Sequence, residues 1–189
     1  ISPDNKKMAF GVDTLSRRIY TIKVKDLGTG KMYPDKIHGV NSYTTWASDS
    51  KTMFYTGKDE QTLRSDKIFR HTLGESQDDD TLVYEEKDET FSTYVYPSKS
   101  REYIMIGSTS TMATEYRFLS SKTPLESFKV LQKRERGLEY SPSHVGDMFY
   151  ISTNIDESTN FKLVKTPITS TEKSNWKDVI PHREDVLIE

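Results

Sequence analysis

The sequence has 189 residues, of which 33% are hydrophobic and 30% charged, and its 11 Tyr, 8 Phe and 2 Trp argue against a disordered chain. The net charge of −2 gives no basic field to attract nucleic acid, and no apolar run approaches the ~20 residues that span a bilayer, so we expect neither partner. Cysteine is absent, which excludes disulfides and thiolate metal sites and agrees with the cytoplasmic location that we expect.

The chain opens with a short polar turn, Ser2–Asn5, which leads into an apolar run, Met8–Val12. A second strand-like stretch, Tyr20–Val24, follows a polar loop, and a third, Lys31–Ile37, follows a second turn. Alternation of apolar and polar residues in such short segments is typical of half-buried β-strands. Residues 1–40 are therefore predicted to form one unit of antiparallel strands.

The same order of turn, apolar run, second strand and third strand returns in residues 41–90, 91–137 and 138–185. The polar turns are Ser48–Lys51, Pro97–Ser100 and Ser143–Gly146, and the apolar runs are Met53–Thr56, Tyr103–Ile106 and Met148–Ile151. The second strands are Lys67–His71, Tyr116–Leu119 and Phe161–Val164, and the third are Thr81–Glu85, Phe128–Gln132 and Trp176–Ile180. Stretches between the units, such as Tyr43–Trp46 and Thr93–Tyr96, supply a fourth strand.

A period of ~45–50 residues with four strands per unit is typical of β-propeller blades. We therefore predict an all-β protein in which residues 1–189 form part of a β-propeller, about four blades of four-stranded antiparallel sheet. The apolar runs of these blades should begin near Met8, Met53, Ile104 and Met148, and the first blade should be incomplete. A β-sandwich also has many short strands, but it does not require this repeat.

Motifs for chemistry are sparse in this sequence. It has no Gly-x-Ser-x-Gly nucleophile elbow, and its four histidines, His38, His71, His144 and His182, fall in predicted turns or strands without a Ser or Asp signature. We therefore predict no catalytic residue in this chain, and no cofactor.

Two further segments resemble ligand loops only in part. Gly28–Lys31 lacks the earlier glycine and the following Ser or Thr of a phosphate loop, so a hairpin turn is expected there. Asp78–Asp80 lacks the glycine and distal glutamate of a calcium loop, so a solvated loop is expected and no metal site is predicted.

Several short patterns, in order along nearly the whole chain, resemble the prolyl oligopeptidase family of serine peptidases, and within it the oligopeptidase B branch. They are Ser2-Pro3-Asp4, Ser16-Arg17-Arg18 with Tyr20, Leu27-x-Thr29-Gly30, Trp46-x-x-Asp49-Ser50, Phe54-Tyr55, Leu82-x-Tyr84-Glu85-Glu86-Lys87-Asp88, Glu139-Tyr140-Ser141, Asn160-Phe161 and Ile180-Pro181-x-Arg183-Glu184. No single pattern is diagnostic, but their order and spacing together are fairly specific.

The resemblance implies a seven-bladed propeller that caps an α/β-hydrolase domain and admits only short peptides. This chain would supply roughly the first four blades. The hydrolase domain would be its partner and would carry the catalytic residues, and it is absent from residues 1–189. The oligopeptidase B branch cleaves after Lys and Arg, so short basic peptides would be the substrates of the parent protein.

Arg17 and Arg18 lie in the loop between the first two strands. In the family that the chain resembles, charged propeller loops form salt bridges to the hydrolase domain that latch the closed state. A guanidinium suits that role because it makes bidentate pairs with carboxylates, and Arg18 is our first candidate. The alternative is a pair of solvated loop arginines.

Two other functions stay open from the sequence. The first is a stand-alone propeller that binds a protein or peptide partner, since fold alone does not decide function. The second is an enzyme with a site in the propeller channel, such as a glycosidase with paired carboxylates. Glu85-Glu86 and Glu184-Asp185 are such pairs in sequence, but neighbours along a strand point to opposite faces.

A propeller interrupted within the ring leaves unpartnered faces on its end blades. We expect these faces to present Phe10, Tyr20 and Ile22 at one end and Phe149, Tyr150 and Leu163 at the other. The isolated chain is therefore expected to self-associate through its end blades or to be marginally stable.

Overall fold

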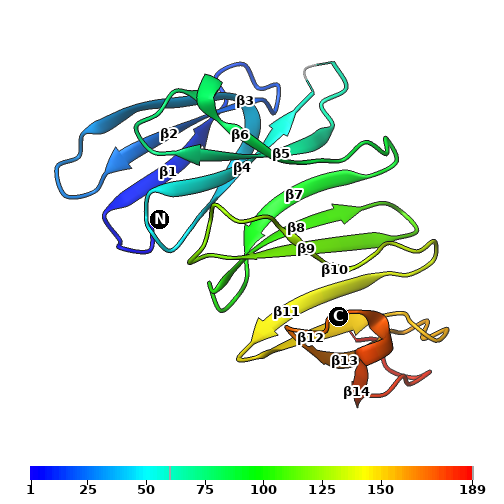
Figure 1. Cartoon of the computed structure of the whole chain (residues 1–189). Coiled ribbons are helices and arrows are strands. Elements are labelled where there is room, and N and C mark those ends of the chain that lie inside the picture. Colours follow the sequence, from blue (N-terminus) through cyan, green and yellow to red (C-terminus); the bar gives the residue numbers. More distant parts are fainter. Residues whose placement is uncertain (60, 189) are drawn as a thin grey trace.

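The computed structural model describes residues 1–59 and 61–188, which form β-strands joined by turns and two short 3-10 helices (Figure 1). The strands are β1 (Lys7–Val12), β2 (Tyr20–Asp26), β3 (Met32–Trp46), β4 (Thr52–Lys58), β5 (Ser65–Thr72), β6 (Thr81–Glu85), β7 (Ser92–Pro97), β8 (Tyr103–Thr109), β9 (Thr114–Ser120), β10 (Lys129–Gln132), β11 (Tyr140–Val145), β12 (Met148–Thr153), β13 (Lys162–Pro167) and β14 (Lys177–Ile180). The 3-10 helices are η1 (Gln77–Asp79) and η2 (Lys173–Asn175). The predicted all-β class is confirmed.

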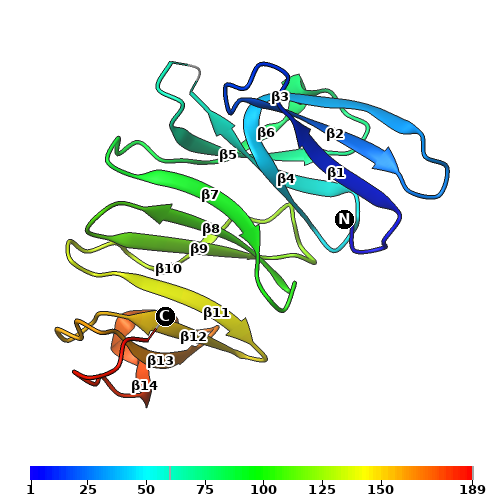
Figure 2. The same cartoon turned by 180° about the vertical axis from the view of Figure 1, so that it is seen from behind.

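The strands form three antiparallel sheets, each a simple meander. One sheet has six strands in the order β1 to β6, and two have four strands each, β7 to β10 and β11 to β14. The sheets follow one another along an arc, with the N-terminus at one end and the C-terminus in the last sheet (Figures 1 and 2). Successive meanders stacked in this way are the blades of a β-propeller.

The first two predicted units differ from the expectation, because they share the continuous strand β3 instead of forming separate sheets. The first part of β3 pairs with β2 through Ile37 and Ile22, and its last part pairs with β4 through Thr44 and Tyr55. The register shifts between Val40 and Thr44, so the strand changes partners without ending. We call β1, β2 and residues 32–40 blade 1; residues 41–46 with β4 to β6 are blade 2; β7 to β10 and β11 to β14 are blades 3 and 4.

Three of the predicted polar turns have the same backbone conformation. Asn5, Ser50 and Arg101 each have a positive φ, of 58°, 55° and 62°, in the turn before β1, β4 and β8. The expected fourth turn, Ser143–Gly146, is wrong in its first three residues, because Ser143, His144 and Val145 lie within β11. The turn there consists of Gly146 and Asp147, and it pairs Val145 directly with Met148. A two-residue turn of this kind needs positive φ, and Gly146 supplies it at 62°.

Each junction between neighbouring blades has its own hydrophobic core. The core between blades 1 and 2 contains Ile22, Val24, Ile37, Val40, Trp46, Met53 and Tyr55. The core between blades 2 and 3 contains Ala47, Phe54, Ile68, Val95, Ile104, Ile106 and Leu119, and that between blades 3 and 4 contains Met105, Tyr116, Phe118, Leu131, Leu138, Tyr140, Phe149, Ile151 and Val164. Burial on both faces of the inner blades explains why β4 and β8 are almost continuously buried.

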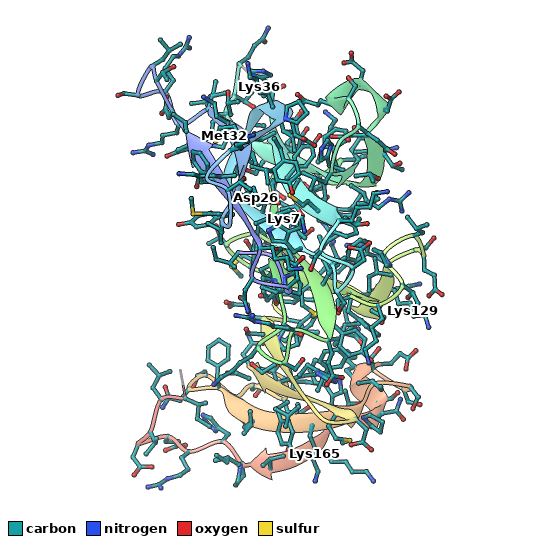
Figure 3. All side chains as sticks on the ribbon, turned by 90° about the vertical axis from the view of Figure 1, so that its left-hand side faces the viewer. Lys7, Asp26, Met32, Lys36, Lys129 and Lys165 are labelled. Carbon is teal, nitrogen blue, oxygen red and sulfur yellow. The ribbon has the colours of Figure 1, made fainter. Side chains whose placement is uncertain are left out.

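Two residues expected on the open end faces are instead in these cores. Ile22 and Phe149 are both 0% exposed, because at their positions the alternation of the strand directs the side chain towards the neighbouring blade. Phe10, Tyr20, Tyr150 and Leu163 are half-buried. The open face of blade 1, on the side shown in Figure 3, carries Met32 and Lys36, both labelled there.

Candidate functional site

The connections β1–β2, β4–β5, β8–β9 and β12–β13 all lie along one side of the arc (Figure 1). The β6–β7 and β10–β11 connections reach the same side, which we call the loop face. Loops held on a rigid sheet scaffold commonly carry the binding residues of a protein. The loop face is therefore the candidate location of a binding site.

The β1–β2 loop, which carries Arg17 and Arg18, is held in a defined shape by Asp13. The Asp13 carboxylate accepts hydrogen bonds from the backbone N–H groups of Leu15, at 3.0 Å, and Arg18, at 2.8 Å. Ser16 and Arg18 have positive φ, of 54° and 58°. Burial by itself would raise the pKa of Asp13, but the backbone N–H groups, that of Arg18 first, outweigh it and lower the pKa. Asp13 therefore stays ionised and fixes the loop.

Arg17 and Arg18 themselves point their side chains to solvent. Both residues are exposed, and neither guanidinium has an ion pair or hydrogen bond with any other residue that the structure describes. Lys58 from the neighbouring blade donates to the Arg18 carbonyl oxygen at 2.9 Å. Leu15 in the same loop is 76% exposed. The loop thus offers to a partner one apolar side chain and two cations that are unpaired within residues 1–59 and 61–188.

A buried ionic network joins blades 2 and 3 behind the loop face. The Arg134 guanidinium contacts Glu86 Oε2 at 2.5 Å and Oε1 at 3.3 Å, and it reaches Glu115 at 3.2 Å. The Tyr84 hydroxyl also donates to Glu86, at 2.6 Å, and Arg117 contacts Glu115 at 2.6 Å. The network connects the end of β6 with β9 and with the loop after β10.

The electrostatics of this network keep Glu86 and Arg134 charged. Burial by itself would raise the pKa of Glu86, but the hydrogen bonds from Arg134 and Tyr84 outweigh it and lower the pKa. Arg134 also lies over the ring of Phe91, 3.9 Å from its centroid. Glu86 is buried while its neighbour Glu85 is exposed, so this carboxylate pair does not converge on one point. The network is built to hold two blades together and leaves no free carboxylate pair there for acid–base chemistry.

A pocket of about 470 Å³ opens on the loop face beside this network. Its lining comes from three connections: Asp88, Thr90 and Phe91; Ser110, Thr111, Met112 and Ala113; and Arg134, Glu135 and Arg136. Sequence reasoning missed both the pocket and the network. The charge run Lys133–Arg136 was the available signal, but such a run usually marks a solvated surface.

The histidines do not form a catalytic triad among the described residues. His71 contacts two carboxylates, those of Asp35 and Asp80, and no nucleophilic serine. His144 Nδ1 lies 2.8 Å from Ser100 Oγ, but its Nε2 is buried without a polar partner and its ring packs against Tyr103. A serine nucleophile needs a base that a third group orients, and that group is missing here.

The other two histidines have local contacts. His38 meets the Thr21 hydroxyl at 3.0 Å, and His182 Nε2 lies 3.4 Å from the Asn160 backbone N–H.

The two segments that resemble ligand loops have structural roles. Asp26 accepts hydrogen bonds from Thr29, and Gly30 has a φ of +74°, which makes this segment a turn between β2 and β3. Asp80 belongs to the His71 cluster. The part of the chain described by the structure contains no group of three or more His, Cys, Asp or Glu side chains arranged for a metal ion. It also contains no helix long and apolar enough to cross a membrane.

The stacked antiparallel meanders and the separate core at each junction define a β-propeller whose loop face carries the exposed arginines and the pocket. The chain belongs to the family described as the N-terminal β-propeller domain of prolyl oligopeptidase, which matches it over residues 1–189. The resemblance seen in the sequence is confirmed at this level.

Its similarity to characterised proteins extends over the whole chain. It is 41% identical to a dipeptidyl aminopeptidase BI of Pseudoxanthomonas mexicana and 28% identical to a protease 2 of Moraxella lacunata, covering 100% of this chain and 26% and 29% of theirs. Oligopeptidase B from Leishmania major superposes with a TM-score of 0.91 and 31% identity, over 97% of this chain and 26% of that one. The chain thus spans little more than a quarter of the length of these relatives.

Proposed function

We propose that this chain is the propeller part of a serine oligopeptidase and that it limits access to the active site to short peptides. The supporting observation is the family match along the whole chain, together with the small share of each relative that the chain covers. The partner in this proposal is the hydrolase domain of the same protein, which would carry the nucleophile, base and acid. The propeller would contribute size selection and no catalytic group.

For the cleavage site there are two candidates. The similarity to oligopeptidase B supports our expectation of cleavage after Lys and Arg in short basic peptides. The higher identity to a protein named dipeptidyl aminopeptidase supports a second candidate, the release of dipeptides from a free N-terminus. The two differ in whether the substrate must have a free amino group.

The experiment compares matched fluorogenic peptides on the protein that carries this chain. One peptide has a blocked N-terminus and Arg or Lys before the scissile bond, and the other is the same residue pair with a free N-terminus. Cleavage of the blocked peptide supports the endopeptidase, and cleavage of the free peptide alone supports the dipeptidyl enzyme. A folded protein of basic composition should resist cleavage while its peptides are cleaved. Hydrolysis of neither peptide would contradict the proposal and favour a stand-alone binding propeller.

We further propose that Arg18, with Arg17, latches the propeller to the hydrolase domain. Guanidinium groups on an ordered, exposed loop, with no ion pair to another described residue, support this role, because they can pair with carboxylates without first breaking an internal ion pair.

We also propose a cytoplasmic location for the protein. Fractionation of cells that express the protein tests it.

A further inference from the structure

A buried histidine lies between two carboxylates at the junction of blades 1 and 2. His71 Nδ1 is 2.7 Å from Asp80 Oδ1, and His71 Nε2 is 3.0 Å from Asp35 Oδ1. The side chains of His71 and Asp35 are each 1% exposed, and that of Asp80 is 3% exposed. The cluster is remote from the loop-face arginines and takes no part in the proposed function.

With both carboxylates ionised, the hydrogen-bond geometry requires a proton on each ring nitrogen. A neutral imidazole has one N–H and one lone pair, so one of its two carboxylate contacts would bring two lone pairs together. Asp35 Oδ1 already accepts from the Gly74 N–H at 2.6 Å, and Asp35 Oδ2 is buried without a partner. A proton placed on Asp35 Oδ2 would therefore have no acceptor. The imidazolium is the form in which His71 makes both contacts.

Both carboxylate oxygens of Asp80 have a hydrogen-bond partner, whereas Asp35 Oδ2 has none among the described residues. Asp80 Oδ2 accepts from the Tyr55 hydroxyl at 2.7 Å. Among the described residues, no Lys or Arg forms an ion pair with Asp35 or Asp80. Two titratable groups thus contact His71: Asp35 of β3, and Asp80, which directly precedes β6. Tyr55 of β4 contacts Asp80 on its other oxygen. Among the described residues, His71 is therefore the group that can supply positive charge to both carboxylates.

The two carboxylates belong to different blades. Asp35 lies in the first part of β3, which pairs with β2 of blade 1, and Asp80 lies between η1 and β6 of blade 2. A second bridge runs beside the first: Gln77 of η1 accepts from the His38 N–H at 2.8 Å and donates to the His38 carbonyl at 3.0 Å. Neither this amide bridge nor the hydrogen bond from the Gly74 N–H to Asp35 needs the His71 proton, so the junction has one attachment that depends on that proton and two that do not.

We propose that His71 is a proton-dependent clamp between blades 1 and 2. As an imidazolium it joins Asp35 to Asp80. When it loses a proton, the remaining N–H stays with Asp80, which makes the shorter contact and is supported by Tyr55. Nε2 then presents a lone pair to Asp35 Oδ1, and this contact is lost. The outer part of β3 is then held to blade 2 by Gln77, by the Gly74 N–H that donates to Asp35, and by the hydrophobic core.

The direction of the pH dependence follows from the same contacts. Burial by itself would lower the pKa of His71, but hydrogen bonds and charges of Asp80 and Asp35 outweigh it and raise the pKa above its ordinary value of 6.5. The stabilisation is therefore fully present below the unfolded-state value and is lost as the pH rises through the folded-state pKa. Between these two values the folding equilibrium constant should fall by up to about tenfold per pH unit.

The test uses the protein that carries this chain, with 15N-labelled histidine. NMR of the ring nitrogens should show His71 doubly protonated above pH 6.5, and hydrogen exchange of residues 32–38 should accelerate, beyond the intrinsic rate increase, once His71 deprotonates. H71Q should abolish the pH dependence of exchange. The matched control is H38Q, which removes an exposed histidine of β3 and should retain the pH dependence of exchange.

Two results would overturn the proposal: a neutral His71 ring at pH 6, or the same pH-dependent exchange in H71Q as in the unmodified protein. If H71Q does not fold, Asp35→Asn keeps the test decisive, because it removes one carboxylate and keeps the shape of the side chain. It should lower the pKa of His71, whereas an unchanged titration of His71 in this variant would also overturn the proposal.

Discussion

Gly107 in β8 has no room for a side chain. A Cβ at this position would lie 2.5 Å from Tyr94 Cζ and 2.7 Å from its hydroxyl oxygen, so the ring would have to move. We predict that Gly107→Ala lowers the free energy of unfolding by about 1–3 kcal/mol, the usual cost of overpacking. Chemical denaturation measures this cost, and it should shrink in a Tyr94→Ala background. Gly28→Ala is the control, because its nearest neighbour would be 3.5 Å away and the change should stay within about 0.5 kcal/mol.

Arg18 is the second residue for which the structure gives a sharp expectation. Its side chain has no described partner within the chain, so Arg18→Ala should leave the melting temperature unchanged. If Arg18 latches the hydrolase domain, the variant should shift the open–closed balance of the full-length protein by a few-fold, as expected for one exposed ion pair.

Small-angle scattering and peptide hydrolysis measure the shift in Arg18→Ala. Lys99→Ala is the matched control, because Lys99 is exposed in the β7–β8 turn, away from the loop face. Kinetics and scattering that do not differ between Arg18→Ala and Lys99→Ala would remove Arg18 from the latch.

Between the elements of blades 2 and 3, Arg134 forms an ionic link to Glu86 beside the hydrophobic core of that junction. Arg134→Ala would leave Glu86 and Glu115 buried without their shared cation, and we expect a loss of about 3 kcal/mol in unfolding free energy. Arg136→Ala is the control, because this neighbour is exposed and should cost less than about 0.5 kcal/mol. Equal effects of the two substitutions would show that the network does not hold the blades together.

The ionic network of Arg134, Glu86 and Glu115 predicts that the stability of the fold falls in acid. The pKa of Glu86 is lowered in the folded chain, so its stabilisation is present above its unfolded-state value near 4.5 and is lost as the pH falls through the folded value. Denaturation at pH 6 and below pH 4 should show this loss in the unmodified chain and a smaller one in Arg134→Ala.

The strands of this chain could be predicted because their alternation and turns are local properties. The runs beginning near Met8, Met53 and Met148 became β1, β4 and β12 as expected. The continuity of β3 could not be predicted, because it depends on two different partner strands that meet it at Ile37 and Thr44. The contacts of Arg134 and His71 could not be predicted either, since they join segments far apart in the sequence.

For the whole molecule, the end blades determine how the isolated chain behaves. By alternation, the open face of blade 1 carries Lys23, Lys25 and Lys36, and that of blade 4 carries Lys165 and Lys177. Contact between the two ends would bring these lysines together around half-buried apolar side chains. We therefore predict that the isolated chain self-associates more strongly at 0.5 M than at 0.05 M salt, because salt screens the repulsion.

Light scattering over a dilution series at both salt concentrations tests this prediction. The salt dependence separates association through the end faces from contact through oppositely charged surfaces, which salt would weaken. A strictly monomeric chain with a melting temperature independent of concentration would show that the ends are protected in another way.

The family could be inferred from scattered short patterns, whereas the peptidase function that we propose would depend on residues outside 1–189. Exposed Arg17 and Arg18 could be nominated because a charge pair in a predicted loop is visible in one sequence. The pocket lined by Phe91 and Met112 could not, because it forms where three loops of different blades meet.

In the function that we propose, this chain forms part of the propeller of a serine peptidase and supplies none of its catalytic residues. The most direct measurement is to label the protein that carries the chain with a serine-reactive phosphonate and to map the modified serine by mass spectrometry. We predict one labelled serine, outside residues 1–189, and loss of peptide hydrolysis in step with labelling. A labelled serine within residues 1–189, or phosphonate-sensitive hydrolysis by the isolated chain, would contradict the account.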